Sequence, residues 1–235
     1  MRQRTERSPE PQVEQCSELA LIPVLATAGY YVLPADLQRS SAVQFLPQFL
    51  AYCSLAVWVF KNKAASFRLG LAWSQRAQGL QWGVPVGVTL GVVNAMVILW
   101  IVPRLGADIE FLRETPHARM PAFLMLPWAI LFIAIGVELN FRGFLLGRLM
   151  DLSQRPWLRD YPGLGSGMAL VVSALVFAFD PFMVATFKHL HWIAVWDGLV
   201  WGMMWIRLRN LYATIVAHAV EVIVMYSVLK MVFNA

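Results

Sequence analysis

Charged side chains are scarce in this chain of 235 residues. Asp, Glu, Lys and Arg make up 14% of it, whereas hydrophobic residues make up 59%, and the mean hydropathy is +0.59. So few charges cannot cover the surface of an ordinary soluble domain, and such a composition is typical of polytopic membrane proteins. The sequence therefore excludes a soluble globular protein and predicts an integral membrane protein.

Cysteines and metal-binding motifs are nearly absent as well. The two cysteines, Cys16 and Cys53, have no redox or metal-ligand spacing, which excludes a disulfide framework, and we expect both side chains to be buried. The chain has no phosphate loop, HExxH helix or CxxC pair. His189 and His191 are poorly placed to share a metal because residues two apart diverge on a helix. We therefore predict no cofactor and no metal.

The net charge of +5 does not require a nucleic-acid partner. Most lysines and arginines lie in residues 1–16, 61–76, 148–159 and 207–209, which share one side of the membrane if the N-terminus is cytoplasmic. Basic residues on that side face anionic lipids. We therefore predict lipids rather than nucleic acid as partners, and a bacterial inner membrane with the N-terminus in the cytoplasm.

Apolar segments separated by short polar joints run along the chain. A transmembrane helix needs roughly 20 apolar residues. Segments that approach this length are about 17–34, 43–60, 82–103, 121–145, 166–184, 187–206 and 211–233. Residues 1–16 are polar and lack a signal-peptide core, so we expect a disordered cytoplasmic leader before one transmembrane domain over residues 17–235. The predicted fold is an all-α bundle of about seven transmembrane helices, within a range of about six to eight.

Glycines recur at four-residue spacing in two of these segments. Gly83, Gly87 and Gly91 share one face of the third segment, and Gly198 and Gly202 share one face of the sixth. Small residues at this spacing let helix backbones approach each other closely in lipid. We therefore predict close helix packing at both stripes.

Ionisable residues interrupt the later apolar segments. Glu138 and Arg142 lie four residues apart, so they share a helix face and can pair. Others follow in later segments: His191, Asp197, His218 and Glu221. With a helical rise of about 1.5 Å per residue, Glu138 and His218 belong to one layer on the order of 10 Å below the cytoplasmic surface. Intramembrane charges are costly, so we expect these groups to meet in a cavity that faces the cytoplasm.

This group of side chains is suited to hydrolysis within the membrane. Glu138 in a dry cavity could take a proton from water, Arg142 could hold the carboxylate, and His218 could orient the water or stabilise an oxyanion. A plainer interpretation is structural: an ion pair between Glu138 and Arg142 that locks helices together, and a hydrogen bond from His218 to a facing helix. His191 also has a plainer role, in an interfacial cluster at the outer leaflet.

Two runs of residues resemble motifs of a known family. The run Glu138-Leu-Asn-Phe-Arg142-Gly143 resembles the EExxxR motif of the CAAX protease and bacteriocin-processing (CPBP) family of intramembrane glutamic proteases. The run from Leu211 to His218 resembles the last motif of that family. The resemblance covers about residues 121–225 and implies an intramembrane endopeptidase that cuts a membrane-proximal peptide or protein substrate.

Three positions depart from the family pattern. The first glutamate of EExxxR is Val137, and the middle motif FxxxH, read from Phe177, ends at Pro181. The last motif expects Asn or Asp where Val222 stands. Read from Phe187, the FxxxH pattern ends at His191 instead. With Glu221 as a substitute for the acid at 222, the resemblance gives these candidate catalytic residues: Glu138, Arg142, His218, His191 and Glu221.

The sequence leaves three functions open. The first is a divergent CPBP peptidase in which Glu138 activates water. The second is a catalytically degenerate subunit or assembly factor that keeps the fold and binds a membrane partner. The third is a proton-coupled transporter, because buried acids can relay protons, although the sequence shows no inverted repeat.

Overall fold

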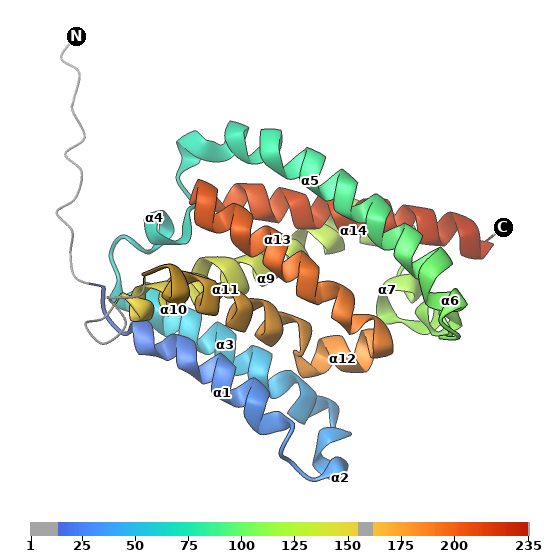
Figure 1. The fold of residues 1–235 in the computed structure, drawn as a ribbon, viewed down its shortest axis with the longest axis horizontal. Coiled ribbons are helices and arrows are strands. Elements are labelled where there is room, and N and C mark those ends of the chain that lie inside the picture. Colours follow the sequence, from blue (N-terminus) through green and yellow to red (C-terminus); the bar gives the residue numbers. More distant parts are fainter. Residues whose placement is uncertain (1–13, 155–161, 235) are drawn as a thin grey trace.

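The protein is an elongated bundle of helices (Figure 1). The computed structural model describes residues 14–154 and 162–234, and these residues form helices and no strands, as the all-α prediction requires. The first half contains α1 (Leu21–Tyr30), α2 (Ala35–Gln38), α3 (Ser41–Lys61), α4 (Ala65–Leu69), α5 (Arg76–Met96) and α6 (Val102–Arg104). The second half contains α7 (Pro116–Arg119), α8 (Ala122–Leu124), α9 (Ile130–Glu138), α10 (Gly147–Ser153), α11 (Pro162–Ala178), α12 (Pro181–Phe187), α13 (Ile193–Leu208) and α14 (Leu211–Asn234).

Short segments of other helix types connect these elements. Tight 3₁₀ turns occur at η1 (Ser17–Ala20), η2 (Trp73–Gln75), η4 (Glu110–Glu114) and η7 (Lys188–Trp192). Wider π-helical segments occur at η3 (Val97–Ile101), η5 (Met125–Ala129) and η6 (Leu139–Leu146). Each predicted apolar segment therefore falls mainly on helical segments, although 166–184 crosses the break between α11 and α12 and 17–34 extends beyond the end of α1.

The number of membrane spans is the part of the prediction that the structure does not confirm. Within the described residues, four helical stretches are long and apolar enough to cross a membrane: Ser41–Lys61, Ala65–Arg104, Ala122–Ser153 and Leu211–Phe233. A fifth arises if Gly165–Ala178 and Pro181–Leu208, bent by 52°, form one broken span, while Ser17–Tyr30 is shorter. The helical membrane bundle is thus confirmed, and the count of seven is not.

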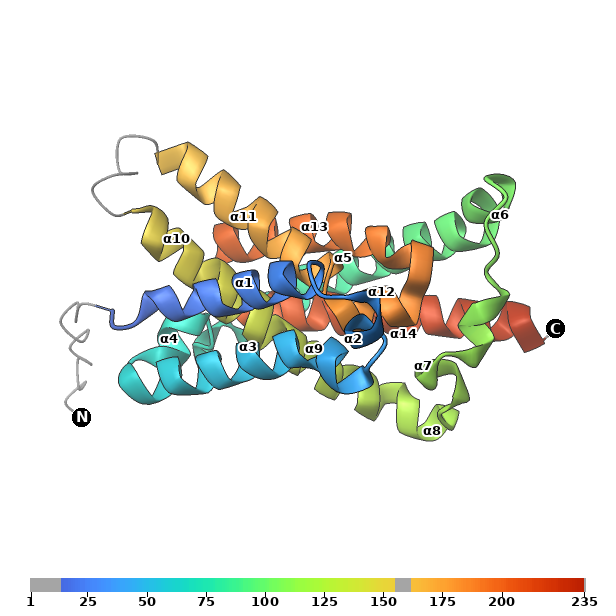
Figure 2. The ribbon, with the colours of Figure 1, turned by 90° about the horizontal axis from the view of Figure 1, so that it is seen from below.

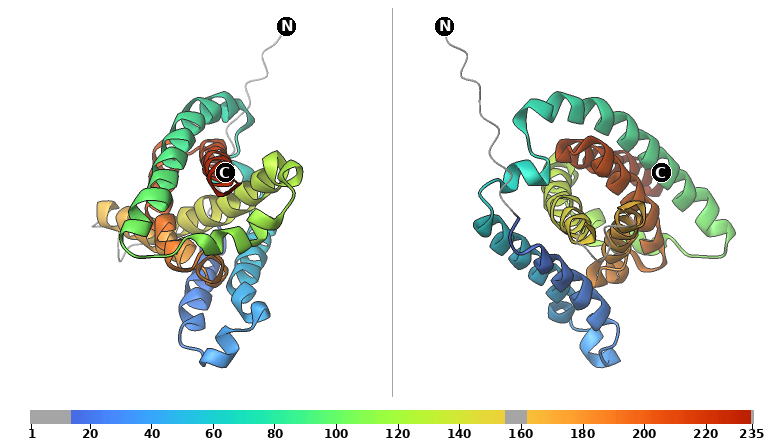
Figure 3. Two further views of the ribbon diagram at one scale, coloured as in Figure 1. Left: turned by 90° about the vertical axis from the view of Figure 1, so that its right-hand side faces the viewer. Right: turned by 60° about the vertical axis from the view of Figure 1, so that its left-hand side comes forward.

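The helices form two outer pairs with a central group of helices between them. End-on views show α1 and α3 side by side at one edge and α5 along α14 at the other, with α9, α11 and α13 between them (Figure 3). The described parts of the chain begin and finish at opposite ends of the bundle (Figure 2). Below, the end with η1, α4 and α10 is called the N-terminal end, and the end with α7 and the last turn of α14 is called the C-terminal end.

Glycines bring α5 unusually close to α14. A Cβ atom placed on Gly83 would lie 2.6 Å from Val216 Cβ, and one placed on Gly87 would lie 2.5 Å from the Ala217 carbonyl oxygen. On Gly91 the same atom would lie 2.8 Å from the Glu221 carbonyl oxygen. The predicted close packing of this stripe is confirmed, and it draws the end of α5 against the middle of α14.

Adding one methyl group to this stripe should destabilise the protein. We expect Gly87→Ala to lower the free energy of unfolding by about 1–3 kcal/mol, because the new Cβ would meet the α14 backbone, which cannot move aside cheaply. The matched control is Gly29→Ala in α1, where no atom lies within 4 Å of the added Cβ and alanine favours the helix. Thermal unfolding of the detergent-purified variants measures both effects. Equal stabilities for the two variants would contradict the proposed packing.

The two cysteines differ from the prediction. Both Cys16 and Cys53 are free, but their side chains are exposed rather than buried. Cys53 lies in α3, where apolar residues such as Phe49 and Tyr52 are also exposed. A helix in lipid can leave apolar side chains outside the protein core, so an apolar run does not by itself predict burial against other helices.

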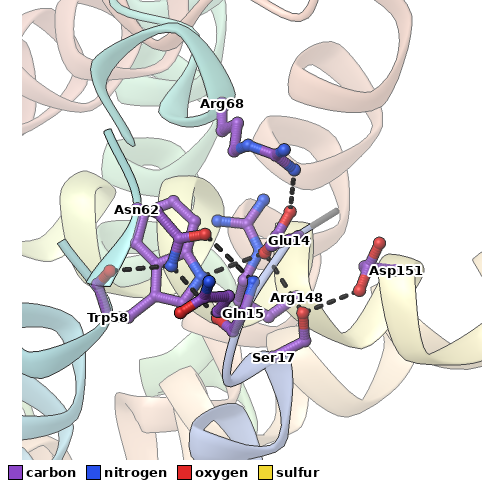
Figure 4. A network of polar contacts seen from close by, with 8 residues as sticks. All are labelled: Glu14, Gln15, Ser17, Trp58, Asn62, Arg68, Arg148 and Asp151. Atoms are coloured by element: carbon purple, nitrogen blue, oxygen red, sulfur yellow. Dashed lines mark hydrogen bonds and ion pairs between the residues drawn. The ribbon is translucent and has the colours of Figure 1, made fainter. Parts of the chain in front are cut away.

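A polar network attaches residues 14–17 to the N-terminal end of the bundle (Figure 4). The Arg68 guanidinium donates to Glu14 Oε2 at 2.6 Å, and the Trp58 indole donates to Glu14 Oε1 at 3.0 Å. Arg148, which is 4% exposed, also pairs with Glu14, and its guanidinium lies 4.1 Å from the centre of the Trp58 ring. Residues 1–13 of the predicted leader lie outside the described residues, while Glu14 at its end is held by this network.

Candidate active site

The structure brings together the three residues in register with the family motifs. Glu138 ends α9, Arg142 lies in η6, and His218 lies in α14. The Arg142 guanidinium donates to Glu138 Oε1 at 3.1 Å, and His218 Nδ1 lies 3.0 Å from the same oxygen. Glu138 is fully buried and Arg142 is 1% exposed. The predicted pairing of Glu138 with Arg142 is confirmed, and His218 joins them from a helix distant in sequence.

The backbone around Arg142 departs from an ordinary α-helix. From Leu139 to Leu146 the chain is π-helical, which widens the turn that carries Arg142. The Ser173 hydroxyl of α11 donates to the Phe141 carbonyl oxygen at 3.0 Å, which fixes this turn against the neighbouring helix. Wide turns of this kind are frequent at functional sites because they reposition a few side chains within a helix.

Aromatic rings fix the positions of the charged groups. The Arg142 guanidinium lies 4.5 Å from the centre of the Phe177 ring and 4.9 Å from that of Trp201, within the range of cation–π attraction. The His218 ring is stacked on Trp201, with the ring centres 4.3 Å apart and the planes tilted by 20°. Trp201, which the sequence analysis did not select, therefore contacts both the cation and the imidazole.

The second glycine stripe makes room for this arrangement. A Cβ atom placed on Gly198 would lie 3.0 Å from Ala174 of α11 and 3.5 Å from Arg142 Nη2. One placed on Gly202 would lie 2.4 Å from Leu170. The predicted close approach is confirmed between α11 and α13, and it allows α13 to present Trp201 beside Arg142.

A second polar group lies in the same interior. The Asn94 side-chain amide, which is fully buried in α5, donates to Glu221 Oε1 at 2.7 Å and to Asp197 Oδ1 at 3.1 Å. The Trp196 indole donates to Asn94 Oδ1 at 2.9 Å. Glu221, predicted to replace the acid expected at Val222, thus binds Asn94 and not the Glu138 group. Asn94 was missed, although a lone amide within the run VTLGVVNAMVILW signals a buried polar contact.

A mostly apolar cavity of about 400 Å³ connects these groups to the C-terminal end. Polar residues line its inner part: Asn140, Asp197, His218 and Glu221. Toward the C-terminal end the lining includes Thr115, Lys230 and Phe233, and Lys230 Nζ donates to the Ala118 carbonyl oxygen at 3.2 Å. If the N-terminus is cytoplasmic, this is the outer end, so the cavity does not extend toward the cytoplasm as expected.

Glu138 and Arg142 are not part of the cavity lining. His218 does line it and holds Glu138 through Nδ1, so the imidazole stands between the glutamate and the cavity. With Nδ1 occupied, Nε2 is the ring nitrogen left to contact water or substrate. The arrangement is that of a carboxylate that orients an imidazole, a geometry in which the imidazole can act as an acid or a base.

His191 lies in the wall of the same cavity, in η7. Its Nδ1 lies 2.5 Å from the Lys188 carbonyl oxygen, and its ring packs against Phe179. Read from Phe177, the FxxxH pattern supplies no histidine nearer the centre, because its last position is Pro181, the first residue of α12. Within the described chain, no contact joins His191 to Glu138, Arg142 or His218, and no three His, Cys, Asp or Glu side chains are arranged to hold a metal ion.

Comparison with known families agrees with the motifs. Residues 119–224 match the family model described as type II CAAX prenyl endopeptidase Rce1-like. The matched range includes Glu138, Arg142 and His218 but not Asn94, and it bears out the predicted resemblance to the CPBP family. Comparisons with curated proteins and with solved structures gave no match.

Proposed function

We propose that this member of the CPBP family is an intramembrane endopeptidase in which Glu138 and His218 together activate water. Its Rce1-like region supports a CAAX-type intramembrane protease activity. The observation that carries the proposal is the contact of His218 Nδ1 with Glu138 Oε1, 3.0 Å apart, at the inner end of an apolar cavity. A carboxylate–imidazole pair of this kind serves as a general base in many hydrolases.

The proposed reaction starts with proton transfer from water to His218. As the water oxygen attacks the peptide carbonyl carbon, its proton passes to His218 Nε2, and buried Glu138 stabilises the imidazolium that forms. Arg142 donates to the same Glu138 oxygen that His218 contacts and so holds the carboxylate in place. The carbon–nitrogen bond of the substrate then breaks as its nitrogen takes up a proton, and a carboxylic acid and an amine are released.

The substrate in this proposal is an apolar peptide segment within or beside the membrane. The cavity walls are built mainly from aliphatic and aromatic side chains, which favour an apolar chain over a charged one. Two buried polar atoms in the lining, Asn140 Oδ1 and Trp201 Nε1, have no hydrogen-bond partner within the described structure. One acceptor and one donor match the N–H and C=O groups of a peptide bond.

Loss of the His218 imidazole tests this function. We expect His218→Ala to slow processing of membrane-anchored apolar peptides in lipid vesicles by about 10²- to 10⁴-fold, the usual loss of a general base. The control is His189→Ala, which removes an exposed imidazole outside the cavity lining and should leave the rate unchanged. Mass spectrometry of the peptide products gives both rates. Wild-type processing by the His218 variant would remove this residue from the mechanism.

A degenerate subunit or assembly factor is the second candidate. The observation in its favour is that Val137, Pro181 and Val222 supply no polar side chain where the family motifs carry a Glu, a His and an Asn or Asp. Under that function the wild-type protein would process no peptide and would co-purify with a stoichiometric membrane partner in mild detergent. Transport of protons with a solute is the third, and it would use the buried acids Asp197 and Glu221 as a relay.

We also propose that the N-terminal end faces the cytoplasm of a bacterial inner membrane. A pocket of about 320 Å³ at that end is lined by Arg68, Arg148 and Arg209, together with Glu14. Arginines are favoured on the cytoplasmic side of membrane proteins, where they meet anionic lipids. In this orientation the peptide would enter the cavity from the outer side of the membrane.

A further inference from the structure

The cavity wall also contains Asp180, which is buried and accepts from Gln48 and two backbone amides, and Lys230, which donates to the Ala118 carbonyl oxygen near the C-terminal end. The interior beside Arg142 and His218 holds more acids than permanent cations. Its carboxyl groups are Glu138, Asp197 and Glu221, each no more than 5% exposed. The cations that face them are Arg142, which donates to Glu138, and His218 when it is protonated. From α5 the facing polar group is Asn94, which is neutral. Three ionised carboxylates beside one arginine would be very costly away from water, so at least one proton must remain in the group.

The geometry of the pair indicates where that proton lies. Asp197 and Glu221 converge on the single Asn94 amide, whose nitrogen lies 2.7 Å from Glu221 Oε1 and 3.1 Å and 3.2 Å from the two Asp197 carboxyl oxygens. Two ionised carboxylates on one neutral donor would repel each other away from water, and a single proton on the pair removes that repulsion. Glu221 Oε2, which has no hydrogen-bond partner in the described chain, is a natural site for that proton.

We propose that Asp197 and Glu221 share one proton and together form the general acid that protonates the leaving amine during peptide hydrolysis. This inference rests on the function proposed above. When the carbon–nitrogen bond breaks, the shared proton passes to the amine nitrogen and leaves the carboxyl pair with one additional negative charge. The proton that His218 took from water then returns to the pair, so that protons balance over one turnover.

The position of the pair is suited to this role. Asp197, Glu221 and His218 all line the cavity, so a peptide bond held there can contact an imidazole base and a carboxylic acid at once. Asn140 and Trp201 line the same region and carry buried, unpartnered polar atoms, which indicates a polar ligand at this point and not a purely structural acid pair.

The shared proton can be tested without any substrate. In infrared spectra of the full-length protein in vesicles, we expect a protonated-carboxyl band at neutral pH that moves on exchange into D₂O. The band should shift or disappear in Asp197→Asn and in Glu221→Gln, and be absent from the double variant. The matched control is Glu110→Gln, which removes an exposed glutamate paired with Arg113 and should leave the band unchanged. No band in the wild type, or an unchanged band in the double variant, would overturn the shared proton.

The acid role is tested by the pH dependence of peptide processing. With a base at His218 and an acid at the carboxyl pair, the wild-type rate should rise and then fall as pH increases. The double variant Asp197→Asn with Glu221→Gln should lower the maximum rate by about 10²-fold or more and abolish the fall at high pH, because no acid of the pair remains to be ionised. A double variant that keeps both the rate and the alkaline fall overturns the acid role. A wild-type protein that processes no peptide overturns the proposed function itself, while the infrared band still decides the shared proton.

Discussion

Replacing Glu138 by Gln should slow peptide processing by about 10³- to 10⁴-fold, the largest change in activity that we expect from any single substitution. The amide has nearly the same shape as the carboxylate and can still accept from Arg142, so the bundle should fold. It cannot stabilise the charged imidazole of His218, and its NH₂ group favours the wrong tautomer of the ring. Rates with membrane-anchored peptides in vesicles measure the loss.

The control for this substitution is Glu110→Gln, which makes the same chemical change at an exposed site. It should keep the wild-type rate. Thermal unfolding of Glu138→Gln shows whether this variant is folded, so that a lower processing rate can be separated from misfolding. Normal processing by a folded Glu138→Gln protein would contradict the mechanism, because the glutamate would then have only a structural role.

Removal of the Arg142 charge should give the largest loss of stability. Arg142→Met leaves Glu138 as an uncompensated charge in a fully buried position, and breaking a buried ion pair in this way costs about 3–5 kcal/mol. Methionine keeps much of the side-chain length between Phe177 and Trp201, so lost packing contributes little. The free energy of unfolding of the purified protein reports the change.

A double variant separates charge from packing in this prediction. Glu138→Gln combined with Arg142→Met removes both charges and should recover most of the stability that Arg142→Met loses. The matched control is Arg113→Met, which breaks an exposed ion pair with Glu110. It should lower the free energy of unfolding by about 1 kcal/mol or less. A double variant as unstable as Arg142→Met would mean that packing, and not the unpaired charge, caused the loss.

The fold could be predicted from the sequence to a useful degree. Hydrophobic segments identified the helices, and glycine spacing identified the two close contacts, because both signals are local in sequence. The count of spans could not be predicted, since it depends on breaks such as the 52° bend between α11 and α12. The predicted burial of Cys53 was also wrong, because in lipid a helix face without helix neighbours is apolar too.

The site was predictable only in part. Glu138, Arg142 and His218 were found because four-residue spacing and motif register place them on facing helices. The partners of Asn94 could not be predicted, because the glycine spacing of α5 indicates a close contact but not which helix, and hence which side chains, it brings against Asn94. The extension of the cavity to the C-terminal end could not be predicted either, since its walls come from helices far apart in the chain.

The central claim is that Glu138 acts through His218, and the most direct test compares single and double variants in one processing assay. If the two residues form one functional unit, Glu138→Gln combined with His218→Ala will be no slower than the slower single variant. If the two losses multiply in the double variant, the residues act independently and the proposed pair does not exist.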